Sequence, residues 1–149
     1  MHRFIASGLF VGFIPRRIRD SDDGAGTFGA VLAAAISLLL WRYPWWAAAT
    51  AFAIAFSLSL WSSAPFANNH ADPGWVVIDE VAGTLVAAIG LTGWPWLVAV
   101  VVARLGDIFK VLPGVAPAEA LPGAIGITMD DVVAGLYGLA AGWMVYWVF

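Results

Sequence analysis

The sequence predicts an all-α fold: a polytopic membrane helix bundle with about four to five spanning helices and a short N-terminal interfacial or re-entrant segment. Of its 149 residues, 62% are hydrophobic and only 11% are charged, whereas roughly 25% of a typical soluble domain is charged. Such a chain cannot cover a water-facing surface with polar groups. Five apolar stretches also approach the length of about 20 residues that a spanning helix needs. The length suits a single domain, residues 1–149.

The five apolar stretches are separated by residues that favour turns. They cover about 28–43, 44–63, 75–91, 94–110 and 129–149. The breaks carry Tyr43-Pro44, Asn68-Asn69 with Asp72-Pro73-Gly74, Thr92-Gly93, and the loop from Pro113-Gly114 to Pro122-Gly123. Because such proline and glycine pairs interrupt helices, we expect one helix for each stretch.

The N-terminal segment differs from these stretches. Residues 4–14 are apolar but too short to span a bilayer, and Pro15-Arg16-Arg17 follows them. A secretory signal would need a longer apolar core and a cleavage site of small residues. A short interfacial or re-entrant element fits better, because arginines at both of its ends would stay at the membrane surface.

The distribution of charges and tryptophans predicts the orientation of the bundle. Antiparallel packing places the turns at 43/44 and 92/93 at one end and the loops 64–74 and 111–128 at the other. Only one of the seven Lys and Arg residues, Arg42, falls at the first end, so the positive-inside rule makes the second end cytoplasmic. The first end also carries an aromatic belt, which is typical of a membrane interface: Trp41, Trp45, Trp46, Trp94, Trp96, Trp143 and Trp147.

The composition excludes several classes of function. The chain has no cysteine, which rules out disulfides, thiolate nucleophiles and cysteine-ligated metals. A net charge of −3 and the lack of a basic stripe argue against nucleic-acid binding. With only two histidines, a histidine-rich metal site is not expected.

Seven ionisable residues fall at the predicted cytoplasmic end, although the stretches that carry them are far apart in sequence. They are Asp79, Glu80, Arg104, Asp107, Lys110, Asp130 and Asp131. We expect Asp79 and Glu80 to begin the third helix, and Asp130 and Asp131 to open the fifth. Ionisable groups inside membrane segments are costly, usually face the bundle interior and mark function.

An ordinary structural explanation competes with a functional one. Acids suit helix N-termini, and Arg104, Asp107 and Lys110 are spaced as a ladder of i,i+3 ion pairs. However, small residues at helical spacing follow the acids, namely Gly83, Gly135, Gly138 and Gly142, and small residues mark the packed face of a membrane helix. Five acids and two bases also leave an excess of negative charge. A divalent cation would balance it, and carboxylate oxygens suit Mg²⁺ or Mn²⁺.

A metal held by carboxylates next to Arg104 and Lys110 is suited to a phosphate ester. The metal polarises the phosphoryl oxygens, and the two cations hold the remaining ones. Gly24-Ala25-Gly26-Thr27 enters the first long helix at the same end. Its backbone N–H groups and the Thr27 hydroxyl could cradle an anion.

Four sequence blocks resemble the phosphatidylglycerophosphatase A family. Residues 72–83, which contain Asp79-Glu80-Val81-Ala82-Gly83, are similar to its DEvxG region, and Arg104-x-x-Asp107-x-x-Lys110 to its second block. Residues 123–135 resemble its GxxGIxxDDxxAG pattern, and Gly26-Thr27-Phe28-Gly29 matches its PGTxGS block in part. Two departures, Ala25 in place of proline and Val111-Leu112-Pro113 in place of Pro-x-Pro, lie at the edge of the site.

The resemblance implies a Mg²⁺-dependent phosphatase of the bacterial inner membrane, with a multi-pass chain and an active site that faces the cytoplasm. It would hydrolyse phosphatidylglycerophosphate to phosphatidylglycerol and phosphate. Nucleic acid would not be a partner, and the sequence leaves the oligomeric state open. A second interpretation keeps the acids but not the chemistry: a small ion-coupled transporter or channel subunit that uses the one-sided acidic cluster.

We assign the site residues on these grounds. The predicted metal ligands are Asp79, Glu80, Asp107, Asp130 and Asp131. Glu80 is either a further ligand or the base that positions water. Asp79, Glu80 and Asp131 form the predicted catalytic set. Thr27, Arg104 and Lys110 are expected to bind the substrate phosphate.

Overall fold

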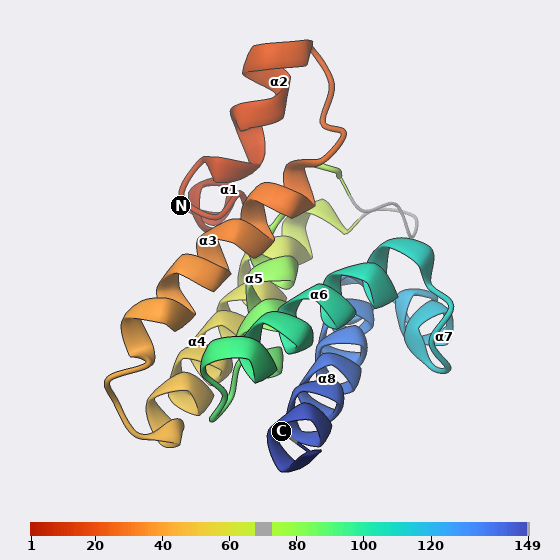
Figure 1. Ribbon diagram of the computed structural model, residues 1–149. Coiled ribbons are helices and arrows are strands. Elements are labelled where there is room, and N and C mark those ends of the chain that lie inside the picture. Colours follow the sequence, from red (N-terminus) through yellow and green to blue (C-terminus); the bar gives the residue numbers. More distant parts are fainter. Residues whose placement is uncertain (68–72, 149) are drawn as a thin grey trace.

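The computed structural model describes residues 1–67 and 73–148, and over these ranges it is entirely helical, as predicted (Figure 1). The turn residues Asn68, Asn69 and Asp72 lie outside the described residues. The elements are α1 (His2–Ala6), η1 (Val11–Phe13), α2 (Ile14–Arg19), α3 (Ala25–Leu40), α4 (Trp45–Ser63), η2 (Ala64–Phe66), α5 (Ile78–Ala87), α6 (Gly93–Phe109), α7 (Val115–Glu119) and α8 (Ala124–Val148).

Aromatic residues from several helices meet at one end of the bundle, which we call the tryptophan end. Trp41, after α3, contacts Trp96 of α6 with ring centroids 5.4 Å apart. Gly90, after α5, lies beside Trp143 of α8 and Trp45 of α4. These contacts bring together four of the seven tryptophans that were predicted to lie at one end, and the opposite end is called the carboxylate end below.

Helix α5 lies at the centre of the bundle and packs against α3, α4, α6 and α8. Nine of its ten residues are buried. It is about 15 Å long at 1.5 Å per residue, which is shorter than the predicted stretch 75–91. The reason lies in its flanks: the Val77 N–H donates to the Ala6 carbonyl, and the chain turns at Gly90 with φ +71°.

Two helical segments are long and apolar enough to cross a membrane, Trp45–Phe66 with 22 residues and Ala124–Val148 with 25. Helices α3 and α6 have 16 and 17 residues and reach about 24–26 Å, against about 30 Å for a hydrocarbon core. The prediction of about four to five spanning helices is therefore not confirmed, since only these two of the described helices are long and apolar enough for a span.

Helix α8 begins earlier than predicted. It starts at Ala124, so Asp130 and Asp131 lie in its second turn and do not open the helix. Gly123, with φ +69°, precedes the helix, and Thr128 Oγ1 donates to the Ala124 carbonyl within the first turn. No residue between Ala124 and Asp130 interrupts the helix, which explains the longer element.

Glycines set the distance between α5 and α8. A Cβ on Gly83 would lie 2.6 Å from the Asp131 carbonyl oxygen, and a Cβ on Gly135 would overlap the Gly83 carbonyl. Gly138 is pressed in the same way against the backbone of α6 at Ala99. The predicted stripe of small residues is confirmed as the packed face of α8, and it brings α5 and α6 close to the acidic turn of that helix.

The Gly83–Gly135 contact makes a stability prediction. Gly135→Ala should lower the free energy of unfolding by about 1–3 kcal/mol, because overpacking a tight contact forces the backbones apart. Leu136→Ala is the control, since Leu136 is its neighbour in α8 and is 49% exposed. Thermal unfolding in detergent measures both variants, and an unchanged melting temperature for Gly135→Ala would contradict the close contact.

Candidate functional site

Three helices bring five carboxylates together at the carboxylate end. Asp79 and Glu80 lie in the first turn of α5, as predicted, Asp107 lies near the end of α6, and Asp130 and Asp131 lie on α8. Asp79 is 1% exposed and Asp131 is 8% exposed. The structure thus gathers all the predicted acidic site residues around the α5–α8 contact.

The acids form two overlapping groups that could hold a metal ion. Asp79, Glu80 and Asp131 make one group, and Asp107, Asp130 and Asp131 make the other. In each group, one oxygen of every carboxylate lies within 4.8 Å of the others. Asp131 belongs to both groups and is therefore the centre of the arrangement.

The hydrogen bonding of these acids fits a cation. Glu80 Oε2 and Asp130 Oδ1 are buried and have no hydrogen-bond partner among the described residues. An unsatisfied buried polar atom costs about 1–3 kcal/mol, and more when it is charged. Several converging carboxylate oxygens are the ligands that hard divalent cations prefer. The residues present therefore fit Mg²⁺ or Mn²⁺ by their donor set.

Arg104 joins the acids to the beginning of α3. Its guanidinium forms an ion pair with Asp107, one turn away in α6, and Nη2 lies 3.5 Å from Thr27 Oγ1. A Cβ on Gly26 would overlap the Glu80 carboxylate and lie 2.8 Å from Arg104 Nη2. A larger residue at position 26 would displace the ends of the Glu80 and Arg104 side chains, so the predicted cradle does lie beside the charged cluster.

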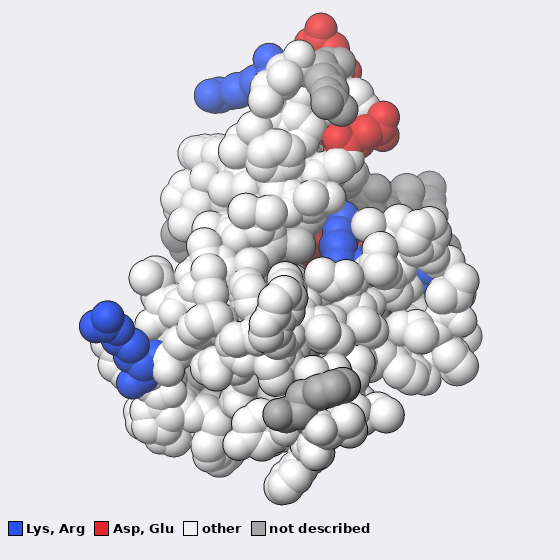
Figure 2. All heavy atoms as spheres, viewed as in Figure 1, with Lys and Arg blue, Asp and Glu red and all other residues white. Residues whose placement is uncertain are grey.

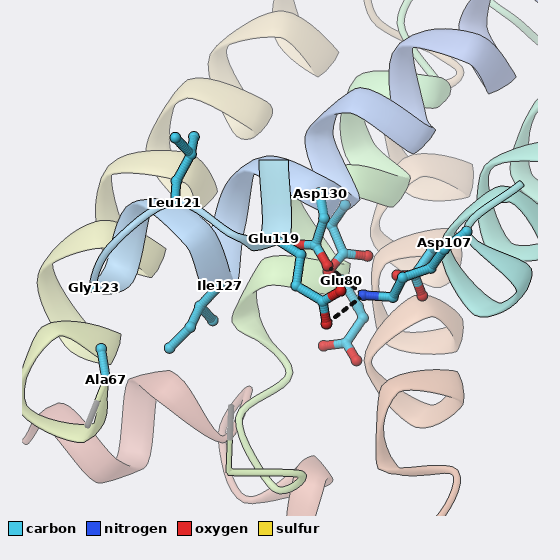
Figure 3. Close-up of a pocket in the computed structure, with 10 residues that line it drawn as sticks. Ala67, Glu80, Asp107, Glu119, Leu121, Gly123, Ile127 and Asp130 are labelled. Carbon is cyan, nitrogen blue, oxygen red and sulfur yellow. Dashed lines mark hydrogen bonds and ion pairs between the residues drawn. The ribbon is translucent and has the colours of Figure 1, made fainter. Parts of the chain in front are cut away.

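Lys110 follows α6 and bridges two further acids. Its Nζ lies 2.9 Å from Asp130 Oδ2 and 2.7 Å from Glu119 Oε1, as the dashed lines in Figure 3 show. Partial burial lowers the pKa of Lys110, but the hydrogen bonds from Glu119 and Asp130 outweigh burial and raise that pKa above its usual value. Lys110 is therefore a cation at physiological pH.

The expected ladder of i,i+3 pairs is only half formed. Arg104 and Asp107 make such a pair, but α6 ends at Phe109, and Lys110 has a left-handed backbone with φ +49°. The Lys110 side chain consequently pairs with α7 and α8, not with Asp107. This placement favours the functional interpretation of the three residues over an ordinary surface ladder.

Sequence reasoning missed Glu119. It ends α7, a five-residue helix inside a segment that was expected to be a loop. Its side chain is 52% exposed and lies at the mouth of the site, on Lys110. No spacing rule links residues 110 and 119, because their contact depends on how the chain folds back between α6 and α8.

A cavity of about 100 Å³ opens beside the acids. Figure 3 shows Glu80, Asp107, Glu119 and Asp130 gathered on one side, with Leu121, Ile127 and Ala67 on the other. The cavity therefore has a charged side and an apolar side. Such a lining suits a molecule that is itself amphiphilic.

Comparison with known proteins gives a consistent result. The chain matches the family described as Phosphatidylglycerophosphatase A over residues 4–146. A protein of Bacteroides thetaiotaomicron, provisionally named a phosphatidylinositol-3-phosphatase, is 31% identical over 165 aligned positions, which cover 97% of this chain and 92% of the relative. Phosphatidylglycerophosphatase A of Haemophilus influenzae is 35% identical over 81 positions, which cover 52% of this chain and 50% of the relative. No solved structure matches the chain.

Proposed function

Because the chain belongs to the phosphatidylglycerophosphatase A family, we propose that it hydrolyses phosphatidylglycerophosphate to phosphatidylglycerol and phosphate with the help of a divalent cation. Family membership makes the protein a phosphatase. The observation that carries the proposal is the set of carboxylates around Asp131, which lies at a cavity that Lys110 and apolar side chains also line, with Arg104 paired to Asp107 of the same set. Residues 1–149 would form one membrane-embedded phosphatase domain.

The cation, Mg²⁺ or Mn²⁺, would be held by Asp79 and Asp131 together with Asp107 and Asp130. Asp131 would serve both groups of acids, since it belongs to each of them. When bound, such a cation polarises the phosphoryl oxygens and stabilises the charge that develops on them. The buried carboxylates would then be neutralised in part, which reduces their mutual repulsion.

Arg104 and Lys110 would bind the phosphate of the lipid. Lys110 already contacts two carboxylates, and Glu119 is the more exposed of the two. An incoming phosphate dianion would therefore replace Glu119 on the ammonium, while Asp130 keeps Lys110 in place. Arg104 offers a planar pair of N–H donors to the other oxygens, and Thr27 lies next to it at the start of α3.

Glu80 would position and deprotonate the attacking water. Asp79 and Glu80 belong to the same group of acids, but adjacent residues in a helix leave the backbone about 100° apart, so we assign them different roles. Glu80 Oε2, which lacks a partner among the described residues, would accept a proton as the water oxygen bonds to phosphorus. The bond between phosphorus and the glycerol oxygen breaks, and the proton held by Glu80 is passed to that oxygen.

We also propose a multi-pass location in the bacterial inner membrane, with the carboxylate end in the cytoplasm. The supporting observations are the two helical segments of spanning length and the tryptophans at the opposite end. The charge distribution of the chain points the same way. Helices α3 and α6 would cross with the bilayer thinned around them, at a modest energetic cost.

Two other functions deserve comparison. The Bacteroides relative is named for a different lipid, but its substrate would also be a phosphomonoester on a polyol headgroup. The cavity described above suits both lipids, whereas the family match favours phosphatidylglycerophosphate. A transporter or channel subunit is not favoured, because both relatives carry phosphatase names.

Turnover tests the proposed chemistry. We expect phosphate release from phosphatidylglycerophosphate in mixed micelles, faster than from phosphatidylinositol 3-phosphate, abolished by EDTA and restored by Mg²⁺. Asp79→Asn and Asp131→Asn should each lower turnover by more than about 100-fold, because several kcal/mol of transition-state stabilisation are lost.

Asp20→Asn is the matched control for these variants, since Asp20 is exposed and lies outside the site. It should retain normal turnover. Near-normal turnover of both Asp79→Asn and Asp131→Asn in folded protein, or full activity in excess EDTA, would refute the mechanism.

Labelling of single cysteines tests the orientation, and the chain contains no other cysteine. Thr92 and Ala120 are exposed, and they lie beyond opposite ends of α6. In inverted membrane vesicles, a membrane-impermeant maleimide should modify Ala120→Cys from the cytoplasmic face and should not reach Thr92→Cys. Labelling of both positions from one face would overturn the proposed topology.

A further inference from the structure

A second basic site lies in the N-terminal segment, away from the carboxylates. Three arginines and two phenylalanines line a cavity of about 440 Å³: Arg3, Phe10, Phe13, Arg16 and Arg17. Figure 1 shows that α2 projects beyond the end of the bundle. These five residues are called the arginine pocket below, and the function proposed above makes no use of them.

Aromatic rings hold one of the arginines in position. The Arg3 guanidinium lies 5.2 Å from the Phe13 ring centroid and 5.4 Å from that of Trp75. Phe13 and Trp75 are themselves stacked, with centroids 5.2 Å apart. Cation–π contacts of this kind orient a guanidinium without neutralising it, so its charge remains available to an anion.

No carboxylate of the described residues pairs with the arginine pocket. The ion pairs in the described part of the chain all involve Arg104 or Lys110. Acidic residues do follow α2 in sequence, at Asp20, Asp22 and Asp23. Figure 2 shows the basic side chains at the left of the projecting tip and the acidic ones at its top and right. Because no described carboxylate forms an ion pair with these arginines, their charge can be matched by an external anion.

Strained backbone presents two apolar side chains at the pocket, its lining residue Phe10 and the neighbouring Leu9. Leu9 and Phe10 both adopt left-handed conformations, with φ +60° and +71°, which cost about 1–2 kcal/mol for each non-glycine residue. Their side chains are 59% and 55% exposed. Strain that turns two large apolar side chains outward points to a role outside the folded chain.

We propose that the arginine pocket binds the headgroup phosphate of an anionic phospholipid, while Leu9 and Phe10 insert into the acyl region of the same leaflet. The inference rests on the membrane location proposed above. Arginines supply the charge that complements a lipid phosphate. A free phosphate would satisfy the arginines but not the two exposed apolar side chains, which favours a lipid as the occupant.

The bound lipid would fix the depth of the catalytic site in the membrane interface. The Val77 N–H donates to the Ala6 carbonyl, and a Cβ on Gly12 would overlap the Trp75 carbonyl. These contacts attach the N-terminal segment to the residues just before α5. Because Asp79 and Glu80 lie at the start of α5, an anchored segment would hold them at the level of lipid headgroups.

A spin label at Leu9→Cys tests the proposal without reference to activity. In phosphatidylcholine vesicles, added phosphatidylglycerol should move the label from a position accessible to a water-soluble nickel chelate to one accessible to oxygen. Arg16→Gln/Arg17→Gln should raise the phosphatidylglycerol fraction needed for half of this change by at least about tenfold, because each arginine near an anionic surface contributes roughly 1 kcal/mol. Arg42→Gln, at the tryptophan end, should not alter the phosphatidylglycerol fraction needed for half of this change.

Three results would overturn the proposal. The first is equal immersion of the label with and without phosphatidylglycerol, and the second is full immersion in the double variant. The third is immersion of the label driven by inorganic phosphate in vesicles of phosphatidylcholine alone, which would identify free phosphate as the occupant. Circular dichroism checks that each variant is folded. Because the label reports only on the N-terminal segment, failure here would leave the phosphatase proposal standing.

Discussion

The close approach of α5 and α8 at Gly83 and Gly135 is the contact on which the site depends. In a bilayer, apolar side chains gain little by leaving lipid, so helices associate mainly through close packing of small residues. Here the packing also has a chemical consequence. Gly83 packs directly against the backbone of Asp131, and this contact places the first turn of α5 against the acidic turn of α8.

The packing imposes an electrostatic cost that a bound cation would relieve. Asp79, Asp130 and Asp131 are all buried, and Arg104 and Lys110 do not neutralise the whole cluster. Buried carboxylates of this number repel one another, and each is costly to desolvate. The buried acids at this end of the bundle therefore cost stability, and the close packing of α5 against α8 acts in the opposite direction.

The sequence predicted the parts of this arrangement that depend on local pattern. The α4 and α6 boundaries followed from apolar length and turn residues, and the packed face of α8 followed from glycine spacing. The short length of α5 could not be predicted from the sequence. The residues before the helix stay outside it because the Val77 N–H donates to the carbonyl of Ala6, which is distant in sequence. Glu119 was missed for a similar reason, since only the folded path of α7 brings it to Lys110.

The most direct test of the account is Mn²⁺ binding followed by electron paramagnetic resonance of the purified protein in detergent. The wild type should bind Mn²⁺ tightly, Asp131→Asn should lose that binding because Asp131 belongs to both groups of acids, and Glu119→Gln should keep it because Glu119 belongs to neither. Unchanged Mn²⁺ binding by folded Asp131→Asn would contradict the central claim that these carboxylates form the metal site of the phosphatase.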